Sequence, residues 1–222
     1  MFFQKIKTLR TLYYNRTGQI LGNDTLAMWL RAIAIDPDVL QIVEIGAWEG
    51  KGSTRVFAEA VSTRPETEPV SIVSLEAAKA RAIRAQKRNR KFRFVQIIWG
   101  SIVSEQDLDH QGLSESENLW ITEDINALKN CPQVLDLIPD SIDALFLDGG
   151  EFSTRKEYDL LFERVTKWLI LDDTASRKCA SISKDIRAGK TPFIVVVDSQ
   201  QRNGFMIALV RTKRSVNSLE TT

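Results

Sequence analysis

The feature that most constrains the fold is a series of seven short apolar runs that starts at residue 40. The first five alternate with stretches of helical periodicity, and their Val, Ile and Leu residues follow one another without regular polar interruption. Continuous runs of this kind are typical of strands covered on both faces, as in parallel sheets. We therefore predict strands at residues 40–46, 69–76, 92–100, 141–149, 167–173, 193–198 and 204–211.

The connections between these runs indicate the topology. Those between the first five leave room for helices, and right-handed crossovers would place such helices on both faces of the sheet. Residues 199–203 are too few for a helical crossover, so the last two runs should form an antiparallel hairpin. The sequence predicts an α/β fold, namely a doubly wound, Rossmann-like, mostly parallel seven-stranded sheet with a C-terminal antiparallel hairpin, in three α/β/α layers. Ligands of such sheets bind at the carboxyl ends of the strands.

The length of 222 residues suits one domain. We expect N-terminal helices packed on the core at 1–36, the α/β domain at 37–211 and a flexible tail at 212–222. Residues 1–14 mix aromatic and basic side chains at helical spacing, which favours packing on the domain over contact with a membrane surface. Segment 104–139 is longer than a crossover requires, so we predict an extra helix or a lid there, anchored by Trp120.

Composition excludes several functional classes. The 30 basic and 29 acidic residues nearly balance, so the overall charge indicates no polyanionic partner. One His and two Cys cannot form a Cys/His zinc cluster or a disulfide framework. No apolar segment resembles a membrane span or a signal peptide. We expect a cytoplasmic protein with a small-molecule partner, and either a monomer or a homo-oligomer.

The segment VEIGAWEGKGST, residues 43–54, carries a glycine-rich turn directly after a predicted strand. Its G-x-x-x-G-x-G spacing differs from the dinucleotide fingerprint, and Trp48 stands where that fingerprint brings a pyrophosphate to the backbone. Glu44 would repel a phosphate but could hold a cationic amino acid. These features count against a nicotinamide dehydrogenase.

Glu76 ends the next predicted strand, where a carboxylate can accept both hydroxyls of a ribose. A ribose joined to a cationic amino acid describes S-adenosylmethionine. The alternative is purely structural, with the glycines forming a tight turn and Glu76 capping a helix.

The segment EIGAWEGKGS resembles the first motif of class I S-adenosylmethionine-dependent methyltransferases, especially of the catechol O-methyltransferase type and of metal-dependent sugar O-methyltransferases. The resemblance extends over residues 41–211. It implies that the cofactor's methionine part is held by the glycine turn, its ribose by Glu76, and its adenine near Ser101. The residues that the resemblance implies for binding the methionine part are Glu44, Gly46, Trp48, Gly50 and Ser53.

Three aspartates follow two predicted strands, Asp148 after the fourth and Asp172 and Asp173 after the fifth. Neighbouring strands lie ~4.8 Å apart, so these carboxylates should converge and require a cation or shared protons. Mg²⁺ is the ion that such oxygen ligands favour. The resemblance implies the same metal site, in which the ion binds two adjacent hydroxyls of the acceptor. Alternatively, Asp148 belongs to a metal-free enzyme and Asp172 or Asp173 caps a helix.

Two further residues bear on the reaction. Asp148 could serve as both ligand and base. The catechol enzymes carry a lysine base shortly after the first metal acid, and Glu151 occupies the comparable place here. This difference favours a sugar-like diol over a phenol as the acceptor. Lys178, shortly after the aspartate pair, either orients an acceptor oxygen or faces water.

The sequence therefore predicts an S-adenosylmethionine-dependent O-methyltransferase for a small sugar-like or diol acceptor, with magnesium assistance left open. Two alternatives remain. One is an RNA methyltransferase that uses the basic run at 79–93, although the pattern favours the solvated face of a helix, for which the acids at 105–109 are candidate partners. The other is a non-catalytic interaction subunit with a methyltransferase-like fold.

Overall fold

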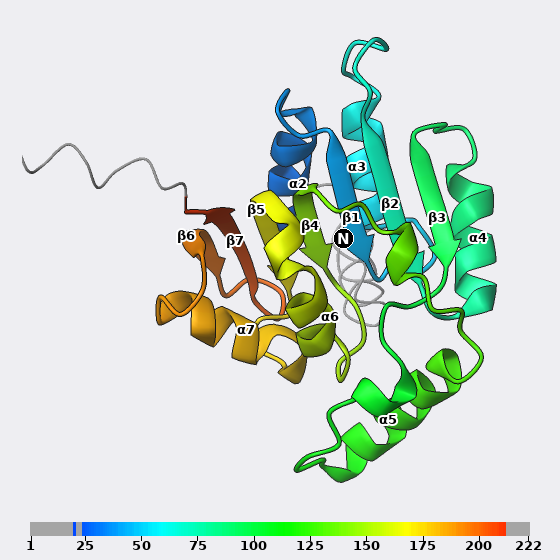
Figure 1. Ribbon diagram of the computed structural model, residues 1–222, viewed down its shortest axis with the longest axis vertical. Coiled ribbons are helices and arrows are strands. Elements are labelled where there is room, and N and C mark those ends of the chain that lie inside the picture. The colour runs from blue at the N-terminus through cyan, green and yellow to red at the C-terminus, as the bar shows by residue number, and fades with distance from the viewer. Residues whose placement is uncertain (1–19, 21–23, 212–222) are drawn as a thin grey trace, which may run out of the picture.

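The computed structural model describes residue 20 and residues 24–211. All seven predicted strands are present in one sheet with the order β3-β2-β1-β4-β5-β7-β6. The strands are β1 (Gln41–Ile45), β2 (Ser71–Glu76), β3 (Val95–Trp99), β4 (Ile142–Leu147), β5 (Val165–Asp172), β6 (Phe193–Ser199) and β7 (Phe205–Val210). The first five are parallel, and β7 pairs antiparallel with both β5 and β6 (Figure 1). The predicted fold class and terminal hairpin are confirmed.

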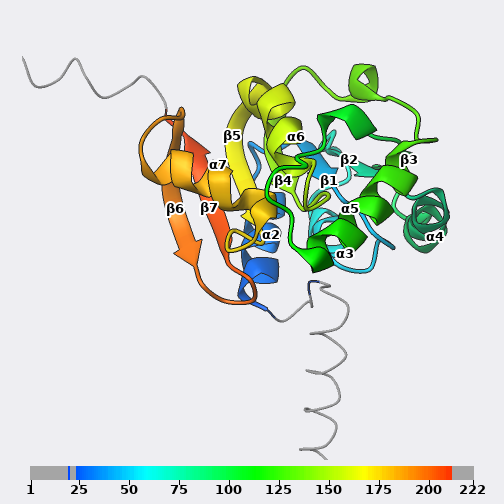
Figure 2. The same ribbon diagram turned by 90° about the horizontal axis from the view of Figure 1, so that it is seen from below.

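Helices cover both faces of the sheet, as Figure 2 shows in a view turned by 90°. One face packs against α2 (Thr25–Ile35) and α3 (Ser53–Val61) through a cluster that includes Leu30, Phe57 and Phe146. The other packs against α6 (Thr154–Leu161) and α7 (Arg177–Arg187), with Tyr158 and Ile182 in the cluster. Because both faces are buried, the strands carry the continuous apolar runs that the sequence displays.

Asp24 caps α2 by accepting a hydrogen bond from the Ala27 backbone N–H at 2.7 Å, which explains why that helix begins at Thr25. Residues 1–14, for which we predict another helix, and the tail at 212–222 lie outside the described residues, and the proposed division into three segments stays a prediction.

Helix α4 (Lys79–Asn89) packs beside β3 at the edge of the sheet. The long segment between β3 and β4 contains α5 (Glu115–Leu128), which a capping box of Ser114 and Glu117 starts. It also contains the short 3₁₀ helices η1 (Glu105–Asp107) and η2 (Leu135–Leu137), and η3 (Phe162–Arg164) follows α6. Figure 1 shows α5 beneath the carboxyl ends of the parallel strands. Trp120 on α5 is 54% exposed, so it does not anchor this helix in the core.

Candidate active site

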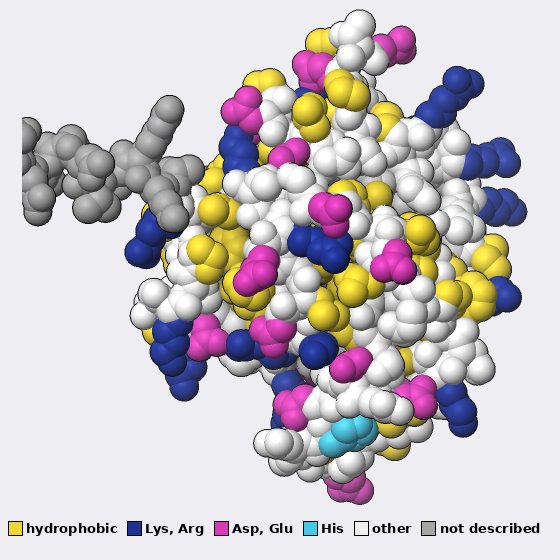
Figure 3. All heavy atoms as spheres, in the orientation of Figure 1, with side chains coloured by type: hydrophobic (Ala, Val, Ile, Leu, Met, Phe, Trp, Pro, Cys, Tyr) yellow, Lys and Arg dark blue, Asp and Glu magenta, His cyan; other side chains and the backbone are white. Residues whose placement is uncertain are grey.

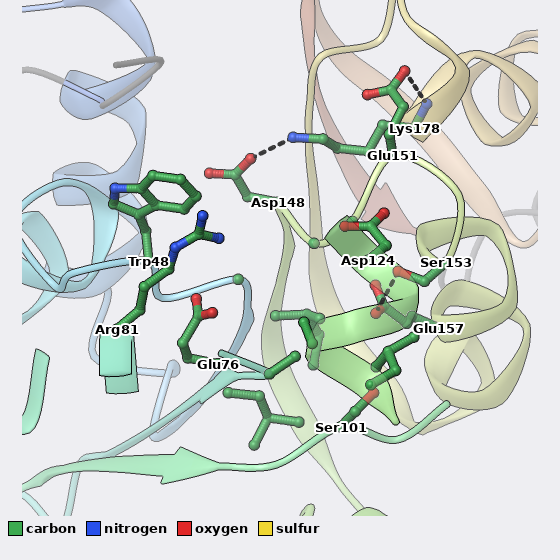
Figure 4. Close-up of a pocket in the computed structure, with 18 of the residues that line it drawn as sticks. Trp48, Glu76, Arg81, Ser101, Asp124, Asp148, Glu151, Ser153, Glu157 and Lys178 are labelled. Atoms are coloured by element: carbon green, nitrogen blue, oxygen red, sulfur yellow. Dashed lines mark hydrogen bonds and ion pairs between the residues drawn. The ribbon is translucent and has the colours of Figure 1, made fainter. Parts of the chain in front are cut away.

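A cavity of about 380 Å³ opens at the carboxyl edge of the sheet, between the strand ends and α5. Its size lies within the usual range of small-molecule sites, roughly 300–1,000 Å³. Six of the residues expected to form a site line it: Gly46, Trp48, Glu76, Ser101, Asp148 and Asp173. Figure 4 shows that the side chains of Trp48, Glu76, Ser101 and Asp148 approach it from different elements of the fold.

Gly46 allows the turn after β1 to pack against the end of β4. Its φ is +97°, and a Cβ atom at this position would lie 2.0 Å from the backbone oxygen of Asp148. Only glycine combines this backbone conformation with such a close approach. The backbone N–H groups of Gly46 and Ala47 both donate to the Leu75 carbonyl of β2, so the turn is held against two neighbouring strands.

Glu44 lies in β1, directly before this turn, and does not line the cavity. Its fully buried carboxylate accepts hydrogen bonds from the hydroxyls of Ser53, Thr54 and Ser74, the last two at 2.6 Å. Burial raises the pKa of Glu44 to about 7, against the effect of the three hydroxyls. Ser53 therefore contacts Glu44 from the first turn of α3, outside the cavity lining.

Gly50 also lies outside the cavity lining. Its φ is +67°, and a Cβ atom would lie 2.4 Å from Nδ2 of Asn89. The Asn89 side chain donates to the Gly50 carbonyl at 2.9 Å, which joins the glycine turn to α4.

Glu76 and Trp48 form one end of the cavity together with Arg81 of α4 (Figure 4). Glu76 is 7% exposed and accepts a hydrogen bond from the Ala78 N–H at 2.9 Å. Burial raises its pKa, and the Ala78 N–H and Arg81 oppose that rise. The Arg81 guanidinium lies 3.5 Å from the centre of the Trp48 ring, a cation–π contact. Trp48 has a φ of +49° and is 40% exposed, so the loop tolerates it as part of the cavity wall.

The three aspartates converge as predicted, since one oxygen of each lies within 4.8 Å of the others. Lys178, on α7, is almost fully buried among them, so the alternative that it faces water is wrong. Its Nζ lies 2.8 Å from Oδ1 of Asp148 and 2.6 Å from Oδ2 of Asp173. Asp172 is 1% exposed and pairs with Arg202 at 3.0 Å, away from the cavity lining.

Comparison with solved structures shows that this fold is a known one. No family model and no curated protein matches the sequence. In structure, the chain is similar to an O-methyltransferase from Bacillus cereus in complex with S-adenosylhomocysteine (15% identity, TM-score 0.53, covering 90% of this chain and 89% of that one). It is also similar to an S-adenosylhomocysteine-bound methyltransferase from Podospora anserina (14%, TM-score 0.56, covering 84% and 78%). A Staphylococcus aureus protein assigned as a caffeoyl-CoA O-methyltransferase gives a TM-score of 0.59 (14%, covering 92% and 91%).

The chain has the fold of class I S-adenosylmethionine-dependent O-methyltransferases. At these identities the likeness establishes the methyltransferase fold alone. Within the described part of this fold, no helix has the length and apolar character needed to cross a membrane.

Sequence reasoning missed three acids of this methyltransferase fold that line the cavity, Glu123 and Asp124 of α5 and Glu157 of α6. Glu157 is 4% exposed, and its Oε1 accepts from the Ser153 hydroxyl at 3.0 Å. Among the described residues, its Oε2 and Oδ2 of Asp124 have no hydrogen-bond partner. Burial raises the pKa of Glu157 to about 7 and that of Asp124 to about 6. The sequence contained one signal for the acids of α5, because side chains spaced three or four residues apart share one face of a helix. The residues on this cavity-facing side are Trp120, Glu123, Asp124 and Ala127.

The basic run lies on α4 at the edge of the methyltransferase fold, where Figure 3 shows Lys and Arg side chains projecting. Arg84 and Arg88 pair with Glu49 of the glycine turn, at 2.9 and 2.6 Å. The expected pairing with the acids at 105–109 is therefore wrong. Within that segment, Asp107 accepts from Ser104, and Asp109 pairs with Arg177 at 2.9 Å.

Proposed function

We propose that the protein is an S-adenosylmethionine-dependent methyltransferase that modifies a hydroxyl of a small, neutral, sugar-like or diol acceptor. One observation carries the proposal: Glu76 and the Gly46 turn meet the Asp148 and Asp124 carboxylates in a single cavity at the carboxyl edge of a methyltransferase fold. That edge is where ligands of doubly wound sheets bind. Two of the similar structures hold S-adenosylhomocysteine, the product that methyl transfer leaves.

We assign the Glu76 end of the cavity to the cofactor, which supplies a methyl group on a sulfonium. Glu76 accepts the ribose hydroxyls, and the turn at Gly46 contacts the methionine part. Trp48, held by Arg81, forms the adjoining wall, and Ser101 lies on the adenine side. Glu44, Gly50 and Ser53 act through the turn, since their contacts hold its backbone in place.

We assign the opposite end to the acceptor. Among the residues that the structure describes, seven carboxylates but only two cationic side chains line the cavity. Such walls accept hydrogen bonds and repel anions. Unpaired oxygens of Asp124 and Glu157 offer acceptor atoms to hydroxyl groups. An acceptor rich in hydroxyls fits this lining, whereas a phosphorylated acceptor does not.

Methyl transfer places the following demands on these residues. The acceptor oxygen attacks the methyl carbon in line with the C–S bond, which breaks with its electron pair going to sulfur. The acceptor hydroxyl loses its proton, and Asp148 is the cavity carboxylate that we assign as its base. Holding the oxygen and the methyl group in contact accounts for much of the rate in such displacements.

Magnesium assistance is the less favoured version of this proposal. Asp148, Asp172 and Asp173 offer oxygen ligands of the type that Mg²⁺ binds. One oxygen of each is already paired with Lys178 or Arg202, so a divalent ion would have to displace these cations to bind there.

The charges around α4 and the cavity weaken the RNA alternative. Three of the α4 arginines contact Trp48 or Glu49, and the cavity beside them is acidic. A non-catalytic subunit would not require unpaired acids in the cavity.

Cys131 and Cys179 are free thiols, in keeping with the expected cytoplasmic location. Homo-oligomerisation stays a prediction.

The test is methyl transfer from radiolabelled S-adenosylmethionine to a panel of acceptors: neutral sugars and diols, a catechol, a coenzyme A thioester and total RNA. We expect labelling of a neutral polyhydroxyl compound, loss of turnover in Asp148→Asn, and retention in the control Asp140→Asn, whose side chain is fully exposed. Labelling of RNA that weakens steeply with salt would support the RNA alternative instead. Labelling of the thioester alone would contradict the assignment of the acceptor.

A further inference from the structure

The group of Asp148, Asp172 and Asp173 contains two cations of the protein itself. Three carboxylates within 4.8 Å repel one another unless positive charge compensates them. Arg202 pairs with Asp172 from the turn between β6 and β7. Asp148 and Asp173, the two members that line the cavity, share Lys178 instead.

Lys178 is held firmly between these two carboxylates. Its side chain is only 10% exposed, and its Nζ makes contacts of 2.8 and 2.6 Å. Its own backbone N–H donates to Oε1 of Glu151 at 3.3 Å, which fixes the first turn of α7 against the cavity. A residue placed in this way occupies the space between the carboxylates that an ion would require.

A divalent ion and the Lys178 ammonium compete for the same two oxygens here, Oδ1 of Asp148 and Oδ2 of Asp173. Mg²⁺ needs oxygen lone pairs at about 2.0–2.1 Å in octahedral geometry. The lone pairs of Asp148 Oδ1 and Asp173 Oδ2 accept hydrogen bonds from the Lys178 ammonium instead. A metal could coordinate both oxygens only after the lysine had moved away, which would leave a buried cation unpaired.

We propose that the Lys178 ammonium takes the place of a metal ion at this site, as a permanent cation between Asp148 and Asp173. An ammonium has three N–H donors, and these two carboxylates use two of them. The third is available to an oxygen atom in the cavity that Lys178 lines. For the methyltransferase proposed above, on which this last step rests, Lys178 orients the acceptor oxygen and stabilises the negative charge that develops there.

Lys178 does not act as the base in this arrangement. Its Nζ donates to Oδ1 of Asp148 and to Oδ2 of Asp173, and an ammonium that donates in this way has no lone pair with which to accept a proton.

Metal binding tests the proposal without cofactor or acceptor, so its outcome is independent of whether the chain methylates anything. The probe is Mn²⁺, titrated into the full chain and followed by the electron paramagnetic resonance signal of the free ion. We expect no stoichiometric binding to the wild-type protein up to millimolar Mn²⁺. Lys178→Ala and Lys178→Gln, which uncover the carboxylates, should bind Mn²⁺ at least tenfold more tightly than the wild-type protein.

Three further variants define the site. Lys178→Arg keeps the positive charge and should not gain binding. Lys184→Ala, on the exposed side of the same helix, should behave as the wild-type protein. Adding Asp148→Asn to Lys178→Ala should abolish the gain. Tight stoichiometric binding to the wild-type protein would overturn the proposal, and this arm needs no variant to fold. Failure of folded Lys178→Ala and Lys178→Gln to gain Mn²⁺ would overturn it as well.

Discussion

Arg202 and Asp172 form an ion pair, with 3.0 Å between Nη2 of the guanidinium and Oδ2 of the carboxylate. Arg202 lies in the turn between β6 and β7, and Asp172 is the last residue of β5. The pair joins the antiparallel hairpin to the parallel part of the sheet, directly behind the cavity carboxylates.

We expect Arg202→Ala to lower the free energy of unfolding by about 3–5 kcal/mol, because it leaves a carboxylate that is 1% exposed without this cation. The matched control is Arg187→Ala, which removes a solvent-exposed pair with Asp198 and should cost about 0–1 kcal/mol. Urea unfolding measures both. Equal losses in the two variants would contradict the structural importance of the buried pair.

Gly46→Ala should lower the free energy of unfolding by about 3 kcal/mol, since it combines positive-φ strain with a clash. The added Cβ would lie 2.0 Å from the Asp148 carbonyl oxygen. Gly189→Ala isolates the strain, because Gly189 has a φ of +67° and no atom within 4 Å of its added Cβ. That control should lose only about 1 kcal/mol. If thermal unfolding ranks the two variants alike, the turn does not pack against β4 as described.

Stability should fall as the pH rises from about 4.5 through about 7, because Glu157 and Glu44 have pKa values raised from 4.5 to about 7 by burial. The folded state holds their protons more tightly than the unfolded state, so the stabilisation is complete below the unfolded pKa and is lost above the folded one. Each group contributes on the order of 3 kcal/mol over this window.

Glu157→Gln and Glu44→Gln should each flatten the pH dependence in this window, since an amide does not titrate. Urea unfolding at a series of pH values measures the slope. A slope unchanged in both variants would mean that neither carboxyl carries a raised pKa.

Much of the fold follows from local patterns. The apolar runs predict the strands because strands buried on both faces need continuous apolar sequence, and residues 199–203 predict the hairpin because their number excludes a helix. The convergence of Asp148 with Asp172 and Asp173 follows from parallel strands that end at one edge.

The remainder depends on where helices lie relative to one another. Lys178 reaches Asp148 only because α7 packs beside the end of β4, and Asp124 enters the cavity only because α5 lies beneath the sheet. Glu44 is an acid that could bind a ligand, but its carboxylate oxygens accept hydrogen bonds from hydroxyls of α3 and β2 instead. Tertiary packing determines which side chains contact one another, and the spacing of residues along the sequence does not specify that packing.

The most direct test of the central claim is calorimetric titration of the purified protein with S-adenosylmethionine, with and without Mg²⁺. Glu76→Ala removes the carboxylate assigned to the ribose, and Glu59→Ala, on the exposed side of α3, serves as its control. We predict micromolar binding to the wild-type protein and to Glu59→Ala, at least tenfold weaker binding to Glu76→Ala, and no effect of Mg²⁺. Absence of binding to the wild-type protein, or equal binding to Glu76→Ala, would contradict the account.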